Sequence, residues 1–371
     1  MSLAVNNSSL TIEKRSGKGH DWGLILSALA ILIVGIFSLY SIDNARHTIF
    51  ASRQMIFAAI GFGVFFICNK IKLEVFKAAT PILYIINIGL LAATLLFGKS
   101  RGETARWIEI GSFQFQPSEV SKLILAITLA AYFANREDRL TELKTYLGAL
   151  LHCAPILALV LLQPHLGATI ALLFLGLVVA ITAGVPWKFF PLTIVLVLVL
   201  GVSSYQTKVM PAYMRARIDS KIQHYVHGKK DKQNADMQQF QSSLAFGMGG
   251  ATGTGWFQGE QKALGAIPEQ ESDFIFSVIG EEGGFFGSSL VVGLYCVFFF
   301  FVWRRVYLAQ TLLGRLVASG LFAVLAFHTV VNLAMVLGFG PVVGLWLPFM
   351  SHGGTALWMC FGALGLLDQC E

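Results

Sequence analysis

Apolar residues are gathered in long runs along this chain of 371 residues, and polar and charged residues fall mainly between the runs. Each run lasts about 17–25 residues, the length that an α-helix needs to cross the hydrocarbon core of a bilayer. Ten segments fit this description: 23–42, 54–70, 78–97, 117–134, 145–163, 165–184, 187–203, 273–303, 315–338 and 353–368. The pattern predicts an all-α integral membrane protein with about ten transmembrane helices.

Two of the stretches between these segments are long enough to carry structure of their own. In the first, residues 98–116, apolar and polar positions alternate on either side of Gly111 and Ser112. A glycine at the first central position is typical of a tight type II′ hairpin turn. We therefore predict a short β-hairpin at the membrane surface.

The second stretch, residues 204–272, is predicted to be a large extracellular loop between the seventh and eighth segments. Glycines cluster within residues 247–259, where the backbone can either approach a ligand closely or be mobile. An amphipathic helix in the membrane interface is expected earlier in the loop. It is indicated by apolar residues at helical spacing: Met214, Ile218, Ile222 and Tyr225.

Composition agrees with a membrane protein and gives its orientation. Charged residues make up 13% of the chain and hydrophobic residues 55%, whereas a soluble domain has about 25% charged residues. Lys and Arg concentrate in the segments on the same side as the N-terminus, so the positive-inside rule places both termini in the cytoplasm. We expect a cytoplasmic tail, 1–22, and a single polytopic membrane domain, 23–371. The net charge of +6 then reflects topology and not nucleic-acid binding.

Five cysteines lie in or beside apolar runs, and none forms a CxxC pair. We interpret them as reduced thiols that fill space, and not as disulfide or metal-binding residues.

Carboxylates are concentrated around the start of the eighth apolar segment. The stretch PEQESDFIFSVIGEEGG, residues 268–284, holds Glu269, Glu271, Asp273, Glu281 and Glu282. As an N-cap or first-turn residue, Asp273 would be stabilised by the helix dipole. Alternatively, the neighbouring acids raise its pKa, which suits a general base. Glu281 and Glu282, two turns into the segment, require water or a cation.

Two further polar pairs lie inside apolar segments. Glu119 and Lys122 are three residues apart on one helical face, either as a structural ion pair or as the lining of a polar cavity. His328 and Asn332 are one turn apart and suit an interhelical hydrogen bond. The run SHGGT, 351–355, precedes the last segment, and a glycine-rich helix start can hold an anion.

At these residues the chain resembles the SEDS family (shape, elongation, division and sporulation), and the similarity covers almost the entire sequence. It is carried, in order, by RWIEIGSFQFQPSEVSK at 106–122, QPHLGAT at 163–169, GTGWFQGEQ at 253–261, PEQESDFIFSVIGEE at 268–282 and PVVGLWLPFMSHGGT at 341–355. The motifs GTGWFQG and FQFQPSE favour the RodA branch, whereas IGEE is equally common in the FtsW branch.

This resemblance implies a peptidoglycan glycosyltransferase of the bacterial cytoplasmic membrane. It would polymerise lipid II at the outer face during cell-wall elongation, together with a class B penicillin-binding protein and possible Mg²⁺ or Mn²⁺. The family's essential aspartate corresponds to Asp273, the expected catalytic base. The expected substrate-binding residues are Arg106, Trp107, Glu119, Lys122, Glu269, Ser351, His352 and Gly353.

The sequence departs from the family pattern at two positions. QPHLG stands where the family has QPDLG, so His165 replaces an aspartate, and SHGGT replaces SYGGS, so His352 replaces a tyrosine. If the missing aspartate helps to bind a cation, this chain binds it differently or not at all. Two other functions remain open: a flippase or transporter of a lipid-linked sugar, and a scaffold without catalytic activity for a transpeptidase partner.

Overall fold

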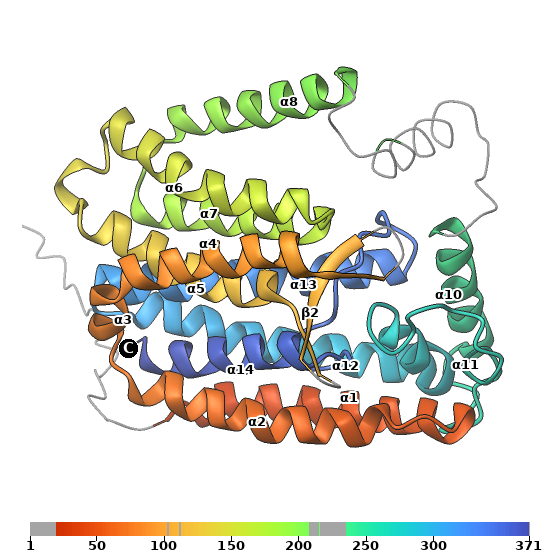
Figure 1. Cartoon of the computed structure of the whole chain (residues 1–371). Helices are drawn as coiled ribbons and strands as arrows, with labels where there is room; N and C mark the ends of the chain where they lie inside the picture. The colour runs from red at the N-terminus through yellow and green to blue at the C-terminus, as the bar shows by residue number, and fades with distance from the viewer. Residues whose placement is uncertain (1–19, 102–103, 111–112, 208–214, 216–234, 371) are drawn as a thin grey trace, which may run out of the picture.

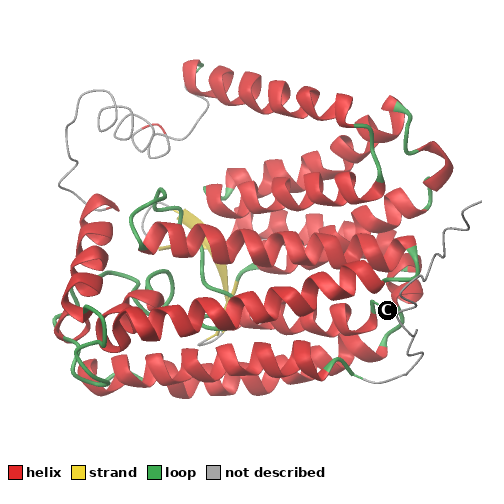
Figure 2. Ribbon diagram, turned by 180° about the vertical axis from the view of Figure 1, so that it is seen from behind, coloured by secondary structure: helices red, strands yellow, loops and turns green. Residues whose placement is uncertain are grey.

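The computed structural model describes residues 20–101, 104–110, 113–207, 215 and 235–370. Helices dominate these residues, and the strands form one small sheet (Figure 2). The long helices are α1 (Trp22–Arg46), α2 (Phe50–Lys70), α4 (Thr80–Phe97), α5 (Pro117–Ala134), α6 (Leu143–Leu162), α7 (Leu166–Ala183), α8 (Phe190–Gln206), α10 (Ala235–Gly249), α12 (Ile275–Leu308), α13 (Leu312–Val336) and α14 (Gly354–Gln369). Shorter helical segments are α3 (Leu73–Ala78), η1 (Glu137–Arg139), η2 (Trp187–Phe189) and α11 (Glu260–Ala263).

Every one of the ten predicted apolar segments coincides with a helix, which confirms the fold class. Among the described residues, eight helices are long and apolar enough to span a bilayer: α1, α2, α4, α5, α6, α7, α12 and α13. The other two predicted segments correspond to α8 and α14, which are shorter at 17 and 16 residues. The chain is therefore a multi-pass membrane protein, and ten crossings remain a prediction.

The long helices other than α10 run side by side, with α13 packed against α5, α7, α12 and α14 (Figure 1). Strand β2, α10, α11 and the start of α12 gather at one end of the bundle. The start of α1, α3 and the C-terminus lie at the opposite end. Functional side chains near β2 and the start of α12 therefore share one end of the molecule.

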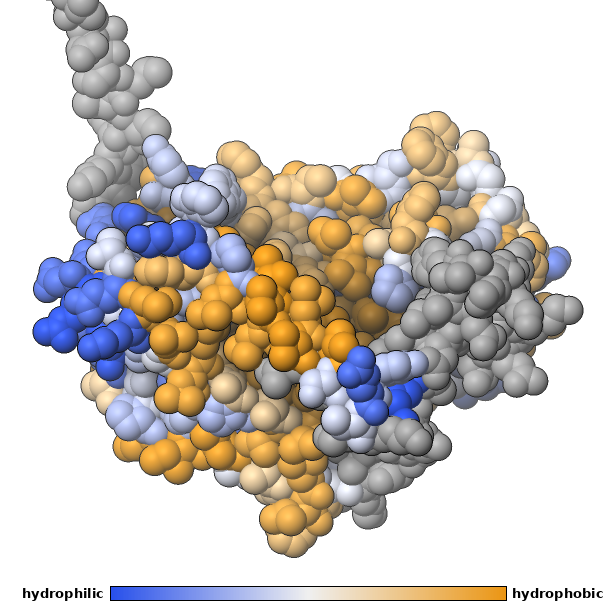
Figure 3. All heavy atoms as spheres, turned by 90° about the horizontal axis from the view of Figure 1, so that it is seen from above, coloured by the Kyte–Doolittle hydropathy of each residue, from blue (hydrophilic) through white to orange (hydrophobic). Residues whose placement is uncertain are grey.

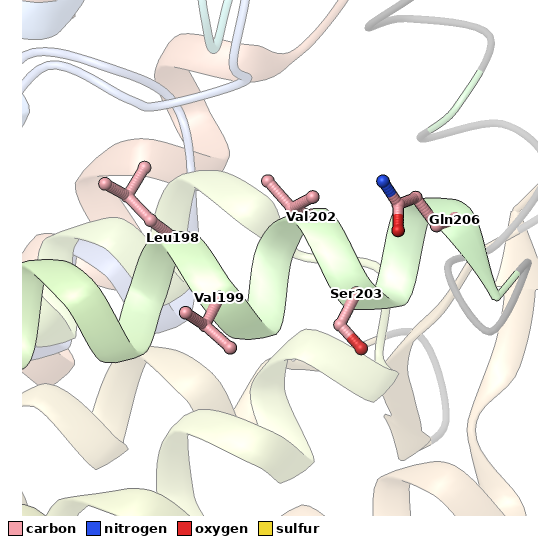
Figure 4. A pocket seen from close by; sticks show the side chains of 5 residues that line it. All are labelled: Leu198, Val199, Val202, Ser203 and Gln206. Atoms are coloured by element: carbon pink, nitrogen blue, oxygen red, sulfur yellow. The ribbon is translucent and has the colours of Figure 1, made fainter.

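The outer surface of the bundle suits lipid. Figure 3 shows a broad hydrophobic face, with hydrophilic residues gathered toward one end. The helix α8 lies at the outer edge of the bundle, and from Ile194 onward its described side chains are exposed. A shallow hollow along it is lined by Leu198, Val199, Val202, Ser203 and Gln206 (Figure 4). This face of α8 is apolar for most of its length.

The predicted β-hairpin is present. Strand β2 (Thr104–Ile110) pairs antiparallel with β3 (Phe113–Phe115), and β1 (Lys99–Arg101) pairs with the other edge of β2. The turn at residues 111–112 lies outside the described residues. The hairpin leads directly into α5, whose first residue is Pro117, where a proline costs no intrahelical hydrogen bond.

The predicted loop 204–272 contains helices of its own, namely α10 and α11. The four apolar residues that predict an amphipathic helix lie outside the described residues. The division into a tail at 1–22 and one membrane domain at 23–371 stays a prediction. All five cysteines are free, as expected from the sequence.

The glycine-rich stretch packs against a break in α12, at Gly284, where φ is 60°. A continuous helix would join the N–H groups of Phe285 and Phe286 to the carbonyls of Glu281 and Glu282. These N–H groups instead bond the carbonyls of Gly250 and Ala251, at 2.9 and 3.2 Å. Backbone amides of the same stretch take over the two freed carbonyls: Thr254 bonds Glu281 and Gly255 bonds Glu282. The glycine-rich loop thus takes the place of two backbone hydrogen bonds that α12 lacks at the break.

Glycine is required in this stretch because two backbones approach each other. A Cβ atom on Gly253 would lie 2.0 Å from the carbonyl oxygen of Glu282, and φ there is 86°. The sequence indicated a close approach to a ligand or mobility, but the approach that the structure shows is to α12.

Candidate functional site

Asp273 lies in the turn that precedes α12, at the end of the bundle that also holds the hairpin. The residue is half-buried. The N-cap position of α12 is Phe274, and no side chain caps the helix. The interpretation of Asp273 as a helix cap is therefore wrong. Among the described residues its carboxylate has no hydrogen-bond partner. Gly344 is close to it, because a Cβ added there would lie 3.3 Å from Oδ2.

The surroundings of Asp273 raise the pKa of its carboxyl group from 3.8 to about 7. Burial is the largest cause, because it disfavours the charged form. The charge of Glu269 raises the pKa further, Arg106 opposes the shift, and Glu271 adds a smaller increase. Such a carboxyl group can both accept and release a proton near neutral pH. The pKa of Glu271 is also raised, chiefly by burial.

The SHGGT segment holds the backbone of this turn. The backbone N–H of His352 donates to the carbonyl of Glu271 at 2.9 Å, and the Ser351 hydroxyl donates to the carbonyl of Ser272. The backbone N–H of Gly353 is bonded to the side chain of Gln54 at 3.3 Å. These contacts are made within the protein, so binding of substrate by Ser351, His352 and Gly353 stays a prediction.

The imidazole of His352 is neutral. It packs against the rings of Phe50 and Phe57, with centroids 5.1 and 5.8 Å away. Burial and the charge of Arg53 lower its pKa to about 4, while Asp43 opposes this shift. A neutral histidine here offers hydrogen bonding to a ligand but no charge.

Glu119 and Lys122 pair as their spacing predicts. The Lys122 ammonium donates to both carboxylate oxygens of Glu119 at 2.8 Å, and both side chains are fully buried. Its third partner is Nε2 of His328 on α13, at 2.9 Å. Trp346 completes the group, because its indole N–H donates to Glu119 at 3.0 Å and its ring lies beside Lys122. All three ammonium protons of Lys122 therefore have protein partners.

The prediction of an interhelical bond from α13 is confirmed for His328, which reaches Lys122 on α5. Asn332 instead binds the backbone of two non-helical segments. Local sequence gave no indication of Trp346, which follows a run of loop residues. The only available signal was an indole N–H in an apolar segment, since such a group requires an acceptor when it is buried.

Arg106 extends from β2 toward the start of α7. Its guanidinium donates to the carbonyl of Gln163 at 3.3 Å and to that of Pro164. Its charge is also close enough to lower the pKa of Asp273. Trp107, the next residue of β2, is half-buried. The hairpin thus places a cation within electrostatic range of the Asp273 carboxylate.

His165, which replaces the family's usual aspartate, is buried just before α7. Burial lowers the pKa of its imidazole well below 6.5, and the charges of Arg106 and Lys122 lower it further. Its Nδ1 lies 3.3 Å from the amide nitrogen of Gln116 and 3.2 Å from the hydroxyl of Ser118, both of which can donate a hydrogen bond to it. The fixed negative charge is therefore absent at this position.

The remaining two carboxylates of the acidic stretch are structural. Glu282 is fully buried and pairs with the Lys262 ammonium and the Ser41 hydroxyl. Glu281 accepts the backbone N–H groups of Gln261 and Lys262, at 2.7 and 3.3 Å. Of the two possibilities that the sequence offered, water or a cation, Glu282 has a cation, Lys262, which the sequence analysis did not single out.

The whole chain from the first helix onward matches a single protein family. The family model described as cell cycle protein, FtsW/RodA/SpoVE, aligns with residues 21–371. The chain belongs to the FtsW/RodA/SpoVE family. The SEDS resemblance drawn from the motifs is confirmed.

Curated relatives of this family cover nearly all of the chain. Peptidoglycan glycosyltransferase MrdB of Escherichia coli is 32% identical over 351 residues, which are 94% of this chain and 92% of MrdB. A relative from Trichlorobacter lovleyi named "Probable peptidoglycan glycosyltransferase FtsW" is 31% identical, with 94% of this chain and 92% of the relative covered. Stage V sporulation protein E of Bacillus subtilis is 30% identical, with 94% and 95% covered. Both branches are thus similar to about the same degree.

Solved structures show the same fold. A chain in a structure of a peptidoglycan synthase complex that coordinates polymerisation and crosslinking has a TM-score of 0.81 and 27% identity, with 95% of this chain and 98% of that chain covered. Rod shape determining protein RodA of Thermus thermophilus has a TM-score of 0.69 and 27% identity, with 95% and 96% covered.

Proposed function

We propose that this chain is a peptidoglycan glycosyltransferase that polymerises lipid II into glycan strands at the outer face of the bacterial cytoplasmic membrane, during cell-wall elongation. Membership of a family with relatives named for this activity supports the reaction class. The observation that carries the assignment to this site is the Asp273 carboxylate, which is half-buried, without a hydrogen-bond partner among the described residues, and raised in pKa to about 7. The RodA-type motifs favour elongation over division.

Asp273 would act as the general base. Its carboxylate accepts the proton of the acceptor sugar's 4-hydroxyl while that oxygen forms a bond to C1 of the donor sugar. The bond from C1 to the lipid diphosphate breaks in the same step, and the diphosphate leaves with the bonding electrons. A base with a pKa near the working pH is the most effective for such a transfer.

The departing diphosphate requires positive charge close to it. Arg106 is the candidate that the geometry supports best, because the hairpin holds its guanidinium near enough for its charge to lower the pKa of Asp273, while it bonds the carbonyls of Gln163 and Pro164. A guanidinium also binds phosphate oxygens in a bidentate manner. Lys122 would have to leave Glu119 or His328 to contact a phosphate. Trp107 and Glu269 complete the proposed substrate contacts, together with Ser351, His352 and Gly353.

A divalent cation, Mg²⁺ or Mn²⁺, stays a prediction. Among the described residues, no three His, Cys, Asp or Glu side chains converge closely enough to hold a metal ion. His165 also lacks the charge that an aspartate would offer. The part of the chain that the structure describes thus offers no cluster of three such ligands, and the steps above are written for protein side chains.

Membrane lipids and a class B penicillin-binding protein are the proposed partners. The exposed apolar surface of the bundle suits the lipid chains of the substrate and of the bilayer (Figure 3). A related chain in a complex that couples polymerisation to crosslinking supports the transpeptidase partner. Both termini would lie in the cytoplasm.

The orientation can be tested by cysteine labelling in intact cells. A Ser220→Cys variant, made in a background without the native cysteines, is expected to react with an impermeant reagent, whereas Arg136→Cys is protected. The reverse pattern contradicts the proposed orientation.

Incubation of the purified protein with lipid II tests the function itself. A glycosyltransferase produces glycan chains without any other protein, whereas a flippase moves lipid II across a vesicle without joining it. A scaffold does neither, even when its transpeptidase partner is added, because a transpeptidase joins peptides and not sugars. The absence of glycan chains with correctly folded protein, alone and with the partner, would exclude the proposed activity.

A further inference from the structure

Asn332 on α13 has contacts that the proposed reaction does not yet use. Its side chain is fully buried. The amide nitrogen donates to the carbonyl of Asp273 at 2.7 Å and to the carbonyl of Leu345 at 2.6 Å. The side-chain oxygen has no partner among the described residues. Both partners are acceptors, so only a side chain with two N–H donors satisfies them.

The two carbonyls belong to segments far apart in the chain that meet beside the catalytic carboxylate. Gly344, next to Leu345, has φ of 67°, and a Cβ there would lie 3.3 Å from Oδ2 of Asp273. On the other side of Leu345, Trp346 donates its indole N–H to Glu119 at 3.0 Å. Residues 344–346 therefore connect the carboxylate of Asp273 with the buried ion pair on α5.

Helix α13 contacts residues 344–346 through two side chains, those of Asn332 and His328. One turn before Asn332, the ring of His328 lies 4.2 Å from that of Trp346, and its Nδ1 is 3.3 Å from the Trp346 carbonyl. In the Asp273 turn, three successive backbone carbonyls accept hydrogen bonds from other segments. The carbonyls of Glu271 and Ser272 are bonded by the SHGGT segment, and only the carbonyl of Asp273 itself is bonded from α13.

We propose that Asn332 is a positioning residue: its amide ties the carbonyl of Asp273 to that of Leu345 and thereby fixes where the Asp273 carboxylate stands. Asn332 acts through the backbone and does not touch the substrate. This inference rests on the proposed function for its effect on catalysis, while the tie itself is a property of the fold. A base displaced by about 1 Å loses about 100-fold in rate, so a single buried amide can control the reaction.

The test compares two substitutions of Asn332 with one matched control. Asn332→Asp keeps the shape but places a carboxylate against two carbonyls, and Asn332→Leu keeps the approximate volume without donors. The control is Asn87→Leu, since Asn87 is equally buried on α4 and bonds the Ser121 hydroxyl at 2.6 Å, outside the proposed machinery. Both sites lose a buried amide, but only one borders Asp273.

Two readouts are measured on the full chain in lipid nanodiscs. Hydrogen–deuterium exchange of amides 272–277 and 344–347 should become faster in both Asn332 variants and stay unchanged in Asn87→Leu. With lipid II, kcat of the Asn332 variants should fall about 100-fold while KM changes less than about threefold. A similar fall in both kcat and melting temperature in Asn87→Leu would show a general structural effect.

The two readouts separate the inference from the function on which it rests. Unchanged exchange in folded Asn332→Leu overturns the tie, whatever the polymerisation result. Faster exchange with wild-type kcat overturns the positioning role. Faster exchange in a protein whose wild type makes no glycan shows that the tie exists and that the proposed function is wrong.

Discussion

Asp273 and Glu282 are close in sequence, on either side of the first turns of α12, but their surroundings are opposite. Glu282 is fully buried and bonded to Ser41 and Lys262. Asp273 is half-buried, and no described residue bonds its carboxylate. A buried charge must be paired to be tolerated, because its desolvation is costly. The unpaired carboxylate is therefore the candidate for proton exchange with a substrate, whereas the paired one links α12 to Ser41 and Lys262.

This contrast extends to the neighbouring loops. The carboxylates of Glu281 and Glu282 accept backbone N–H groups of residues 259–262 and so fix the end of the glycine-rich loop. Other described segments bond residues 271–273 at their backbone carbonyls, which leaves the side chain of Asp273 available. Glu281 and Glu282 thus hold the glycine-rich loop through their side chains, whereas Asp273 is bonded through its backbone and keeps its carboxylate as a candidate catalytic group.

The largest expected effect is that of Asp273→Asn on activity. Asparagine keeps the shape but cannot accept the sugar's proton, so the initial rate with lipid II should fall by about 10²-fold or more. The melting temperature should stay near wild type, because the carboxylate bonds no described residue. Asp273→Glu should recover little, since a longer side chain misplaces the base. Full polymerase activity in folded Asp273→Asn protein would remove Asp273 from the mechanism.

Glu282→Gln should lower the stability of the protein more than its activity, the reverse of Asp273→Asn. It leaves the Lys262 ammonium buried without a counter-charge, which costs about 3–5 kcal/mol of unfolding free energy. The rate per folded molecule should change less than in Asp273→Asn. The loss is measured by thermal or denaturant unfolding in detergent. Adding Lys262→Met, which removes the unpaired charge, should restore part of the stability, and a strictly additive double variant would show that the two charges do not interact.

Glu119 and Lys122 allow a second test of a buried ion pair, and this pair lies next to the candidate site. Removing one partner should destabilise more than removing both, so a double-mutant cycle on melting should show strong coupling. Glu119→Gln, Lys122→Met and the combined variant provide the cycle. Independent effects would contradict the buried pair.

The smallest expected effect is a pH dependence that originates at Asp273. Its pKa is raised from 3.8 to about 7 by folding, so the folded state binds a proton more tightly than the unfolded state does. The resulting stabilisation is fully present below pH 3.8 and is lost as the pH rises through about 7. Activity should increase over the upper part of this range as the base ionises. Comparing unfolding curves at pH 5 and pH 8 should show a smaller difference in Asp273→Asn than in wild type.

Much of the fold follows from the sequence, because the determining forces act locally. A run of about 20 apolar residues in a bilayer must form a helix to satisfy its backbone, and all ten predicted segments are helical. The hairpin was also predictable from local signals, namely the alternation of apolar and polar residues on either side of the turn at residues 111–112. The pairing of Glu119 with Lys122 was also predictable, since residues three apart on a helix face each other.

The break in α12 was not predicted, although glycines occur at both partners of the contact. Residues 273–303 read as one continuous apolar segment, and only the arrival of residues 250–255 makes the break favourable. A hydropathy pattern predicts whether a segment can lie in lipid. It cannot predict that a distant loop will replace hydrogen bonds within the helix.

The sequence by itself determined the helices, the membrane class and the position of the candidate base. Tertiary structure alone decided which polar groups have partners. His328 meets Lys122 across 206 positions, Lys262 meets Glu282 across 20, and Asn332 reaches Asp273 across 59. Such pairs form because desolvated charges and carbonyls must be satisfied wherever the packed helices bring them. Composition and spacing cannot specify that encounter, so which carboxylate is left unpaired becomes visible only in the folded chain.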